Sequence, residues 1–256
     1  RRSRGGGGEA SAPSERSYFQ NFTLLESVPD GGSVISVKKG NHEVVFQEDV
    51  DFRIDRAGLS MKLTAPVVFI GYGIKSEEFG LDDFSGVDLE GKIALRLSGF
   101  PGMNNEESPL YKKIMEDRRA AYQMNRNKNE ILAEKGALAV IEVDLNRDVT
   151  RYWAPVNEAL QMAPNESSWR SDWTRMRLED PQVSNDPVVL SVSHKVANII
   201  LEGTGLELEK YETDAGQGKH YKPIEIRNVE FGMDVRVTNK RVRVRNVMGM
   251  IEGKNK

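Results

Sequence analysis

The alternation of short apolar runs with turn residues predicts a strand-rich first part of the chain. Residues 19–25 form one such run, and the Pro-Asp-Gly-Gly cluster at 29–32 ends it. The run 65–70 is almost wholly apolar, as is typical of a buried strand, and Pro66 lies near its start, where a missing N–H is tolerated. Further strands are predicted at 34–37, 43–46 and 92–97.

The hydrophobic period changes to that of a helix midway along the chain. Ser108 is suited to cap the helix amino terminus, and Pro109 to occupy the first helical position. The helical spacing continues, with a break predicted at the Asn-rich patch 125–129, and Gly136 is placed to follow the last helical residue. A buried strand at 137–143 comes next. This strand–helix–strand order predicts two parallel strands joined by a crossover connection.

The last part of the chain predicts two short helices between strands. A strand at 187–192 is followed by Ser193, which is suited to cap a helix that Gly203 ends. A capping box at 204–207 predicts one more helix. The final strands are predicted at 224–229, 233–237 and 241–251. Together the elements predict the α/β (α+β) class, a strand-rich sheet or barrel with flanking helices.

The connection 146–186 is unusually long and holds every tryptophan of the chain. Tyr152 and Trp153 are predicted to lie close to substrate, because long connections and aromatic side chains are both enriched where partners bind. The alternative is that the aromatic rings of this connection pack onto their own domain as a satellite core. A short amphipathic helix is predicted from the helical spacing of Trp169, Trp173 and Met176.

The composition describes a folded protein with a weak overall charge. The 256 residues carry a net charge of -3 and no cysteine, which excludes disulfides, thiolate metal sites and a cysteine nucleophile. The weak charge gives no reason to expect a nucleic-acid or membrane partner, and no apolar run approaches the roughly 20 residues of a membrane span. Residues 1–16 contain four consecutive glycines and are predicted to form a flexible tail or linker.

No catalytic or metal-binding residue is predicted in this chain, and no cofactor is expected. The three histidines, at 42, 194 and 220, are far apart and none lies in an H-E-x-x-H pattern. Adjacent carboxylates such as Asp82 and Asp83 point in different directions on a strand or a helix, so they rarely share one ion. We interpret these carboxylates, Asp83 included, as turn and capping groups.

Three glycines at predicted strand ends, Gly71, Gly73 and Gly91, are interpreted as structural turns rather than ligand contacts, because reversals there often need a positive φ. A dinucleotide-binding loop is not favoured, since Ser76 stands where the third glycine would be. Basic residues alternate with valine within 240–245. This alternation predicts a half-buried strand with a charged solvent face rather than a nucleic-acid site.

Several segments, in order along the chain, resemble the protease-associated region of the secreted di-zinc aminopeptidases. The matching segments read LTAPVVFIGYGI at 63–74, FGLDDFSGVDLEGKI at 79–93 and AEKGALAVI at 133–141. Residues 187–200 are similar to the strand and helix that close that domain. Residues 18–24 and 245–253 resemble the first strands of the peptidase domain itself.

The resemblance implies a non-catalytic accessory domain that covers a peptidase cleft and modulates which peptides reach it. The partners would be peptide substrates and the peptidase domain of the parent chain, whose two zinc ions lie outside this sequence, in an extracytoplasmic compartment. Unpaired edges of the terminal strands would also allow two copies to dimerise. The implied regions are a tail at 1–16, strands bordering the peptidase domain at 17–50, a protease-associated domain at 51–222 and the first peptidase strands at 223–256.

Two other functions are left open by the residues themselves. The first is an independent peptide- or glycan-binding module that uses the aromatic connection. The second is a purely structural spacer. A hydrolase is disfavoured, because the sequence contains neither a G-x-S-x-G elbow nor a recognisable set of zinc ligands.

Overall fold

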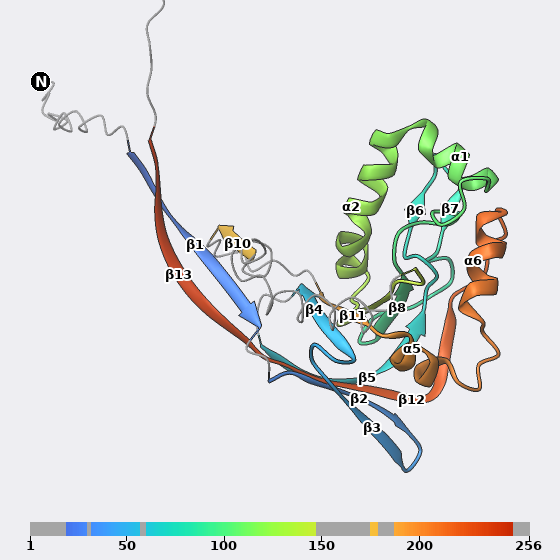
Figure 1. The fold of residues 1–256 in the computed structure, drawn as a ribbon, viewed down its shortest axis with the longest axis horizontal. Coiled ribbons are helices and arrows are strands. Elements are labelled where there is room, and N and C mark those ends of the chain that lie inside the picture. Colours follow the sequence, from blue (N-terminus) through green and yellow to red (C-terminus); the bar gives the residue numbers. More distant parts are fainter. Residues whose placement is uncertain (1–18, 30–31, 57–59, 147–174, 179–186, 248–256) are drawn as a thin grey trace, which may run out of the picture.

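The computed structural model is a mixed α and β fold built on one curled sheet (Figure 1). It describes residues 19–29, 32–56, 60–146, 175–178 and 187–247. The sheet has eight strands in the order β3-β2-β12-β5-β8-β9-β11-β4. Their bounds are β2 (Val34–Lys39), β3 (His42–Gln47), β4 (Phe52–Arg56), β5 (Met61–Phe69), β8 (Ile93–Leu97), β9 (Ala139–Val143), β11 (Val188–Val192) and β12 (Ile224–Val235).

The centre of the sheet is parallel and buried on both faces. Strands β5, β8, β9 and β11 are parallel neighbours, which confirms the predicted parallel pair, and the outer strands are antiparallel. All five residues of β8 are buried. Ile93 and Leu95 join the larger core, whereas Ala94 joins a smaller core with Leu132. Layers on both faces explain why these strands are continuously apolar in sequence.

Four helices flank the sheet within the described residues. Ser108 caps the first of them, since its Oγ accepts the N–H of Tyr111 at 3.2 Å, and it also donates to the carbonyl oxygen of Gly216 at 2.6 Å. Ser193 caps its helix as predicted, and Gly136 follows the second helix with φ +76°. The helices are α1 (Pro109–Glu116), α2 (Arg118–Glu134), α5 (His194–Leu201) and α6 (Leu208–Gly216).

Two helix boundaries differ from the prediction. Helix α2 runs unbroken through the Asn-rich patch and is separated from α1 at Asp117, whose carboxylate accepts the N–H groups of Arg119 and Ala120, both at 2.9 Å. The patch stays helical because the buried face of α2 continues through it, from Met124 before the patch to Leu132 after it. The predicted capping box at 204–207 is also wrong. Thr204 donates to the Leu201 carbonyl oxygen at 2.6 Å, so it closes α5 instead.

Two predicted elements near the end of the chain are also corrected. The segments 224–229 and 233–235 form a single strand, β12, because a bulge between Ile226 and Glu230 absorbs the irregular residues and the ladder with β5 then resumes; Val237 begins β13. Met176 lies in a short strand, β10 (Arg175–Leu178), rather than in a helix, because it pairs with Glu26. Trp169 and Trp173 lie outside the described residues.

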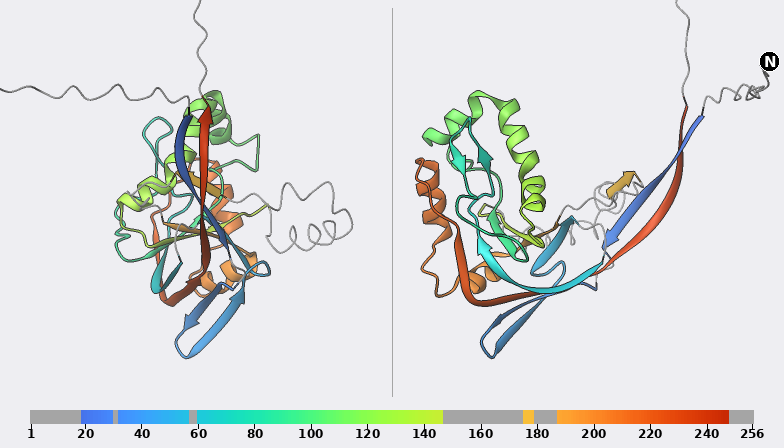
Figure 2. Two further views of the ribbon diagram at one scale, coloured as in Figure 1. Left: turned by 90° about the vertical axis from the view of Figure 1, so that its left-hand side faces the viewer. Right: turned by 180° about the vertical axis from the view of Figure 1, so that it is seen from behind.

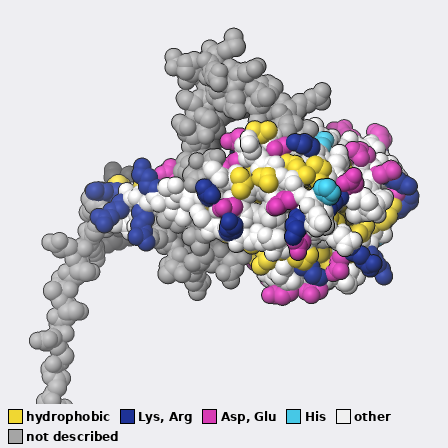
Figure 3. Space-filling view, turned by 90° about the horizontal axis from the view of Figure 1, so that it is seen from below, with side chains coloured by type: hydrophobic (Ala, Val, Ile, Leu, Met, Phe, Trp, Pro, Cys, Tyr) yellow, Lys and Arg dark blue, Asp and Glu magenta, His cyan; other side chains and the backbone are white. Residues whose placement is uncertain are grey.

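A long ribbon leaves the body of the molecule. Strands β1 (Phe19–Pro29) and β13 (Val237–Val247) pair antiparallel along their whole length, and β10 adds to β1. Figure 2 shows this ribbon projecting away from the helices. Lys and Arg side chains gather on it in Figure 3. A two-stranded sheet, β6 (Lys75–Ser76) and β7 (Leu81–Asp82), completes the described strands.

The domain boundaries stay a prediction. Strands from 17–50 and from 223–256 share the main sheet with strands from 51–222.

Candidate functional site

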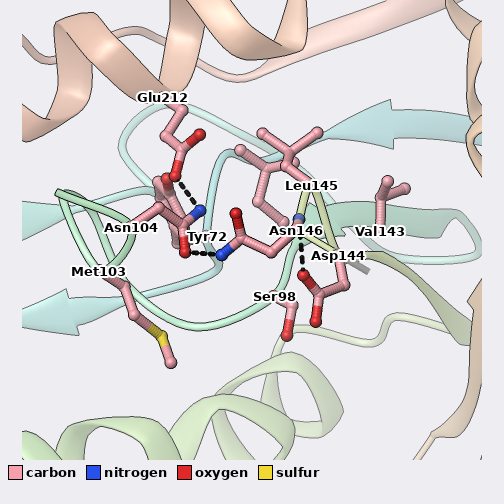
Figure 4. A pocket seen from close by; sticks show the side chains of 10 residues that line it. Tyr72, Ser98, Met103, Asn104, Val143, Asp144, Leu145, Asn146 and Glu212 are labelled. Carbon is pink, nitrogen blue, oxygen red and sulfur yellow. Dashed lines mark hydrogen bonds between the residues drawn. The ribbon is translucent and has the colours of Figure 1, made fainter. Parts of the chain in front are cut away.

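A cavity of about 280 Å³ lies at the carboxyl ends of β8 and β9 (Figure 4). The loops that follow these two strands form its walls, and α6 closes one side through Glu212. Small-molecule sites in parallel sheets are found at this edge, because the loops there carry side chains that converge above the strands. The lining residues are Tyr72, Leu97, Ser98, Met103, Asn104, Val143, Asp144, Leu145, Asn146 and Glu212.

A row of polar groups crosses this cavity. The amide of Asn146 donates to the side-chain oxygen of Asn104, whose own amide donates to the carboxylate of Glu212. Figure 4 shows Asn104 lying between the other two side chains. At the opposite wall, the Asp144 carboxylate accepts the backbone N–H of Asn146 at 2.9 Å. The row therefore links α6 to the β9 loop, although these segments are far apart in sequence.

The cavity is electrostatically negative. Its lining includes two carboxylates, Glu212 and Asp144, and no lysine or arginine among the described residues that form it. Burial raises the pKa of Glu212, the hydrogen bond from Asn104 opposes this, and the nearby charge of Asp144 raises the pKa further. A positively charged or hydrogen-bond-donating group would relieve this unfavourable environment. The cavity is thus suited to the polar end of a small ligand rather than to an anion.

Behind the cavity, the turn at Gly71–Gly73 is fastened by Asp83. One oxygen of the Asp83 carboxylate accepts the backbone N–H groups of Tyr72 at 3.1 Å and Ile74 at 2.9 Å. The positive φ angles of the two glycines, +64° and +66°, allow these N–H groups to converge on it. Burial raises the pKa of Asp83 to about 6, and the two backbone hydrogen bonds oppose that rise.

A second buried polar group lies under α2. Arg96 of β8 contacts Glu142 of β9 through Nε and Nη2, each 2.8 Å from the same carboxylate oxygen, while its Nη1 has no hydrogen-bond partner among the described atoms. The Lys128 ammonium donates to the carbonyl oxygen of Gly99. Burial, followed by the charge of Arg96, lowers the pKa of Lys128 to about 7. The Lys128 contact joins α2 to the loop that follows β8, and the Arg96–Glu142 pair joins β8 to β9.

The structure brings only some of the residues singled out from the sequence together. Gly71, Gly73 and Asp83 form one turn. Gly91 lies elsewhere, at the entry to β8, where its N–H contacts the Gly136 carbonyl oxygen at 3.2 Å and its φ is +69°. The predicted substrate-proximal pair at 152 and 153 lies outside the described residues.

The histidines do not converge on this cavity. His42 and His220 are exposed, and a ring nitrogen of His194 lies 2.7 Å from the carbonyl oxygen of Asp144. Within the described ranges, no group of three or more His, Cys, Asp or Glu side chains is arranged to hold a metal ion. Over the same ranges, no helix is both long and apolar enough to span a membrane.

Sequence reasoning missed Glu212, Asn104 and Lys128. Glu212 and Asn104 lie in polar segments with no motif, so only the packing of α6 against the β8 loop reveals their contact. A weak signal existed for Lys128. It lies seven residues after Ala121 and four after Met124, on the helical face that the apolar residues define.

Comparison with solved structures finds distant likenesses to this chain. An aminopeptidase from Aneurinibacillus sp. strain AM-1 superposes with a TM-score of 0.39 and 14% sequence identity, over 89% of this chain and 36% of that protein. The chain therefore spans about a third of the length of that aminopeptidase. No family model matches the chain, and no curated protein matches its sequence.

Proposed function

We propose that this chain is a non-catalytic accessory domain of a zinc aminopeptidase, which covers the peptidase cleft and modulates which peptides reach it. The observation that carries the proposal is the ribbon of β1 and β13. Phe19 lies opposite Val247 at its outer end, and Pro29 lies opposite Val237 at its inner end. The polypeptide therefore enters and leaves the body of the fold along one path.

This geometry suits a domain attached to a neighbour. When entry and exit lie side by side, a domain can be inserted into another domain without separating the strands of its host. The ribbon projects away from the helices, as Figures 1 and 2 show. The ribbon supports attachment to a neighbouring domain. The sequence resemblance supports a neighbour that contains the two zinc ions and works outside the cytoplasm.

A second candidate is an independent peptide-binding module, and the cavity favours it. A peptide amino terminus or a lysine side chain is a cation that Glu212 and Asp144 would attract. The same cavity is small, near the lower end of the roughly 300–1,000 Å³ of ligand pockets, so it would accept one or two side chains rather than a long segment. The two candidates differ in whether peptide binding needs a peptidase beside it.

The decisive experiment compares the parent protein with this domain alone. The gene is read beyond Lys256, and the parent protein is assayed with a long peptide and with a dipeptide-sized substrate. The accessory role predicts that removing the whole body of the fold, residues 30–236, at the inner end of the ribbon changes KM for the long peptide and leaves KM for the short one nearly unchanged. Equal changes for both substrates, or a parent without a zinc peptidase domain, would refute it. Peptide binding by the isolated chain, with no effect in the parent, would favour the independent module.

A further inference from the structure

The polar row of the cavity directs its amide donors at its own members and leaves oxygen acceptors for a ligand. The Asn146 amide donates to Asn104, and the Asn104 amide donates to one carboxylate oxygen of Glu212. Within the described part of the chain, the side-chain oxygen of Asn146 and the second carboxylate oxygen of Glu212 accept no hydrogen bond. Figure 4 shows the row from Asn146 to Glu212. A ligand that donates hydrogen bonds therefore fits this cavity better than one that accepts them.

A buried hydroxyl group adds a further acceptor to the same cavity. Tyr72 lines the cavity, and only 2% of the residue is exposed. Its backbone N–H donates to Asp83, but its hydroxyl forms no hydrogen bond to any described residue. Buried polar groups are nearly always hydrogen-bonded, so the Tyr72 hydroxyl needs a partner from outside the fold, either water or a ligand.

The carboxylate of Glu212 determines the charge that such a ligand should have. Glu212 is half-buried, and its hydrogen-bond partner, Asn104, is a neutral amide. No lysine or arginine of the described residues lines the cavity. Asp144 already has contacts of its own, so it contributes negative charge rather than a free oxygen. A half-buried carboxylate with no counter-ion beside it favours a cationic ligand.

We infer that this cavity binds a primary ammonium group that carries a short apolar chain. An ammonium group has three donors in tetrahedral directions, and acceptors from three separate segments suit it better than they suit a planar guanidinium group. These acceptors are Tyr72 after β5, Asn146 after β9 and Glu212 of α6. The apolar chain would contact the apolar part of the lining, which is Leu97, Met103, Val143 and Leu145.

A primary ammonium group of this kind occurs at a peptide amino terminus and at the end of a lysine side chain. The inference names the chemistry that the two share, and the experiment below distinguishes them. It deepens the second candidate function, the peptide-binding module, and rests on it. The accessory role is tested separately, in the parent protein.

Other ligands fit the cavity less well. An anion would be repelled by Glu212. A neutral sugar could donate to the same oxygens, but it would leave the Glu212 charge without a counter-ion. A divalent metal ion needs several oxygen ligands, and the described ranges contain no group of three or more His, Cys, Asp or Glu side chains arranged for one.

The inference is tested by titrating small probes against the whole chain, with binding followed by ligand-observed NMR. Leucinamide presents an α-ammonium group, and N-acetyl-lysine amide presents a side-chain ammonium group. N-acetyl-leucinamide has the same apolar chain as leucinamide but no charge. At least one of the two amines is expected to bind, and the neutral probe should bind roughly tenfold more weakly or not at all. The amine that binds more tightly identifies the source of the ammonium group.

A charge-removing variant tests the role of Glu212. Glu212→Gln keeps an oxygen that can accept the Asn104 amide, but it replaces a charged hydrogen bond to the ligand by a neutral one. Binding of the amine should weaken roughly tenfold or more. Glu209→Gln is the matched control, because Glu209 is exposed on the same helix and does not line the cavity. This control should change the affinity less than about twofold.

A second variant separates ligand binding from stability. Tyr72→Phe removes a hydroxyl that has no partner in the described structure, so the melting temperature should stay the same or rise. Affinity for the amine should fall about threefold to tenfold, because one neutral hydrogen bond is lost. A purely structural hydroxyl would give the reverse result, a lower melting temperature with unchanged affinity.

Three results would overturn the inference. The first is that neither amine binds, and the second is that N-acetyl-leucinamide binds as tightly as leucinamide. The third is that Glu212→Gln and Glu209→Gln have equal effects on the affinity. If a tripeptide amide binds while both small amines fail, the peptide-binding module stands and the ammonium site is refuted.

Discussion

The carboxylate of Asp83 accepts the backbone N–H of Tyr72 at 3.1 Å, across a turn that two glycines with positive φ make possible. The contact joins the residue that follows β7 to the turn that follows β5. It holds Tyr72 at the wall of the cavity, where burial, followed by the charge of Glu212, raises the pKa of the Tyr72 phenol. The turn therefore positions Tyr72 in the wall of the cavity.

Gly71→Ala should destabilise the protein more than Gly91→Ala. Both positions have positive φ, which costs a non-glycine residue about 1 kcal/mol. A Cβ at Gly71 would also lie 2.2 Å from the Tyr211 hydroxyl oxygen, whereas a Cβ at Gly91 would meet nothing within 4 Å. Urea unfolding should thus show a loss of about 1 kcal/mol for Gly91→Ala and at least about twice that for Gly71→Ala. Equal losses would contradict the close approach of Tyr211.

Lys128→Met should remove part of the pH dependence of stability. Burial lowers the pKa of the native Lys128 ammonium to about 7, from an ordinary value of 10.5 that applies to the unfolded chain. Between these values the unfolded state binds the extra proton, so the contribution of Lys128 to the free energy of unfolding rises with pH across this window.

The measurement is urea unfolding at several pH values from about 7 to 10. The slope of unfolding free energy against pH should be smaller in Lys128→Met than in the unmodified chain. Lys210→Met, at an exposed position of α6, is the control and should keep the original slope. Parallel curves for all three proteins would show that Lys128 keeps its charge in the folded state.

Ser108→Ala should loosen the contact between α1 and α6. The Ser108 hydroxyl caps α1 and also donates to the Gly216 carbonyl oxygen, and the residue is buried. Its removal leaves two buried backbone groups unpaired, so a loss of about 2 kcal/mol is expected. Thr213→Ala removes an exposed hydroxyl that contacts Glu209 and should cost less than about 0.5 kcal/mol. Thermal melting of the two variants checks the difference.

The isolated chain should not hydrolyse aminoacyl substrates, with or without added zinc. This expectation follows from the proposed accessory role, in which the metal ligands belong to the partner domain. Purified chain is assayed with an aminoacyl chromogenic substrate, and circular dichroism confirms that it is folded. Zinc-dependent turnover that persists through a second purification would contradict the proposed role.

Local features of the sequence determined much of the secondary structure. The Ser108-Pro109 helix start, the hairpin around Gly40 and the alternating basic strand at 240–245 were all predictable, because capping, turn conformation and strand periodicity depend on a few neighbouring residues. Composition alone determined the absence of disulfides, since the chain contains no cysteine.

Long-range packing decided what the sequence left open or indicated wrongly. The Asn-rich patch stays helical because the buried face of α2 continues through it, and burial outweighs weak local preferences. The polar row from Asn146 through Asn104 to Glu212 joins segments that no periodicity connects, so it exists only once α6 lies over the β8 and β9 loops. Local propensity acts over a few residues, whereas a cavity is made by side chains that meet only after the chain has folded.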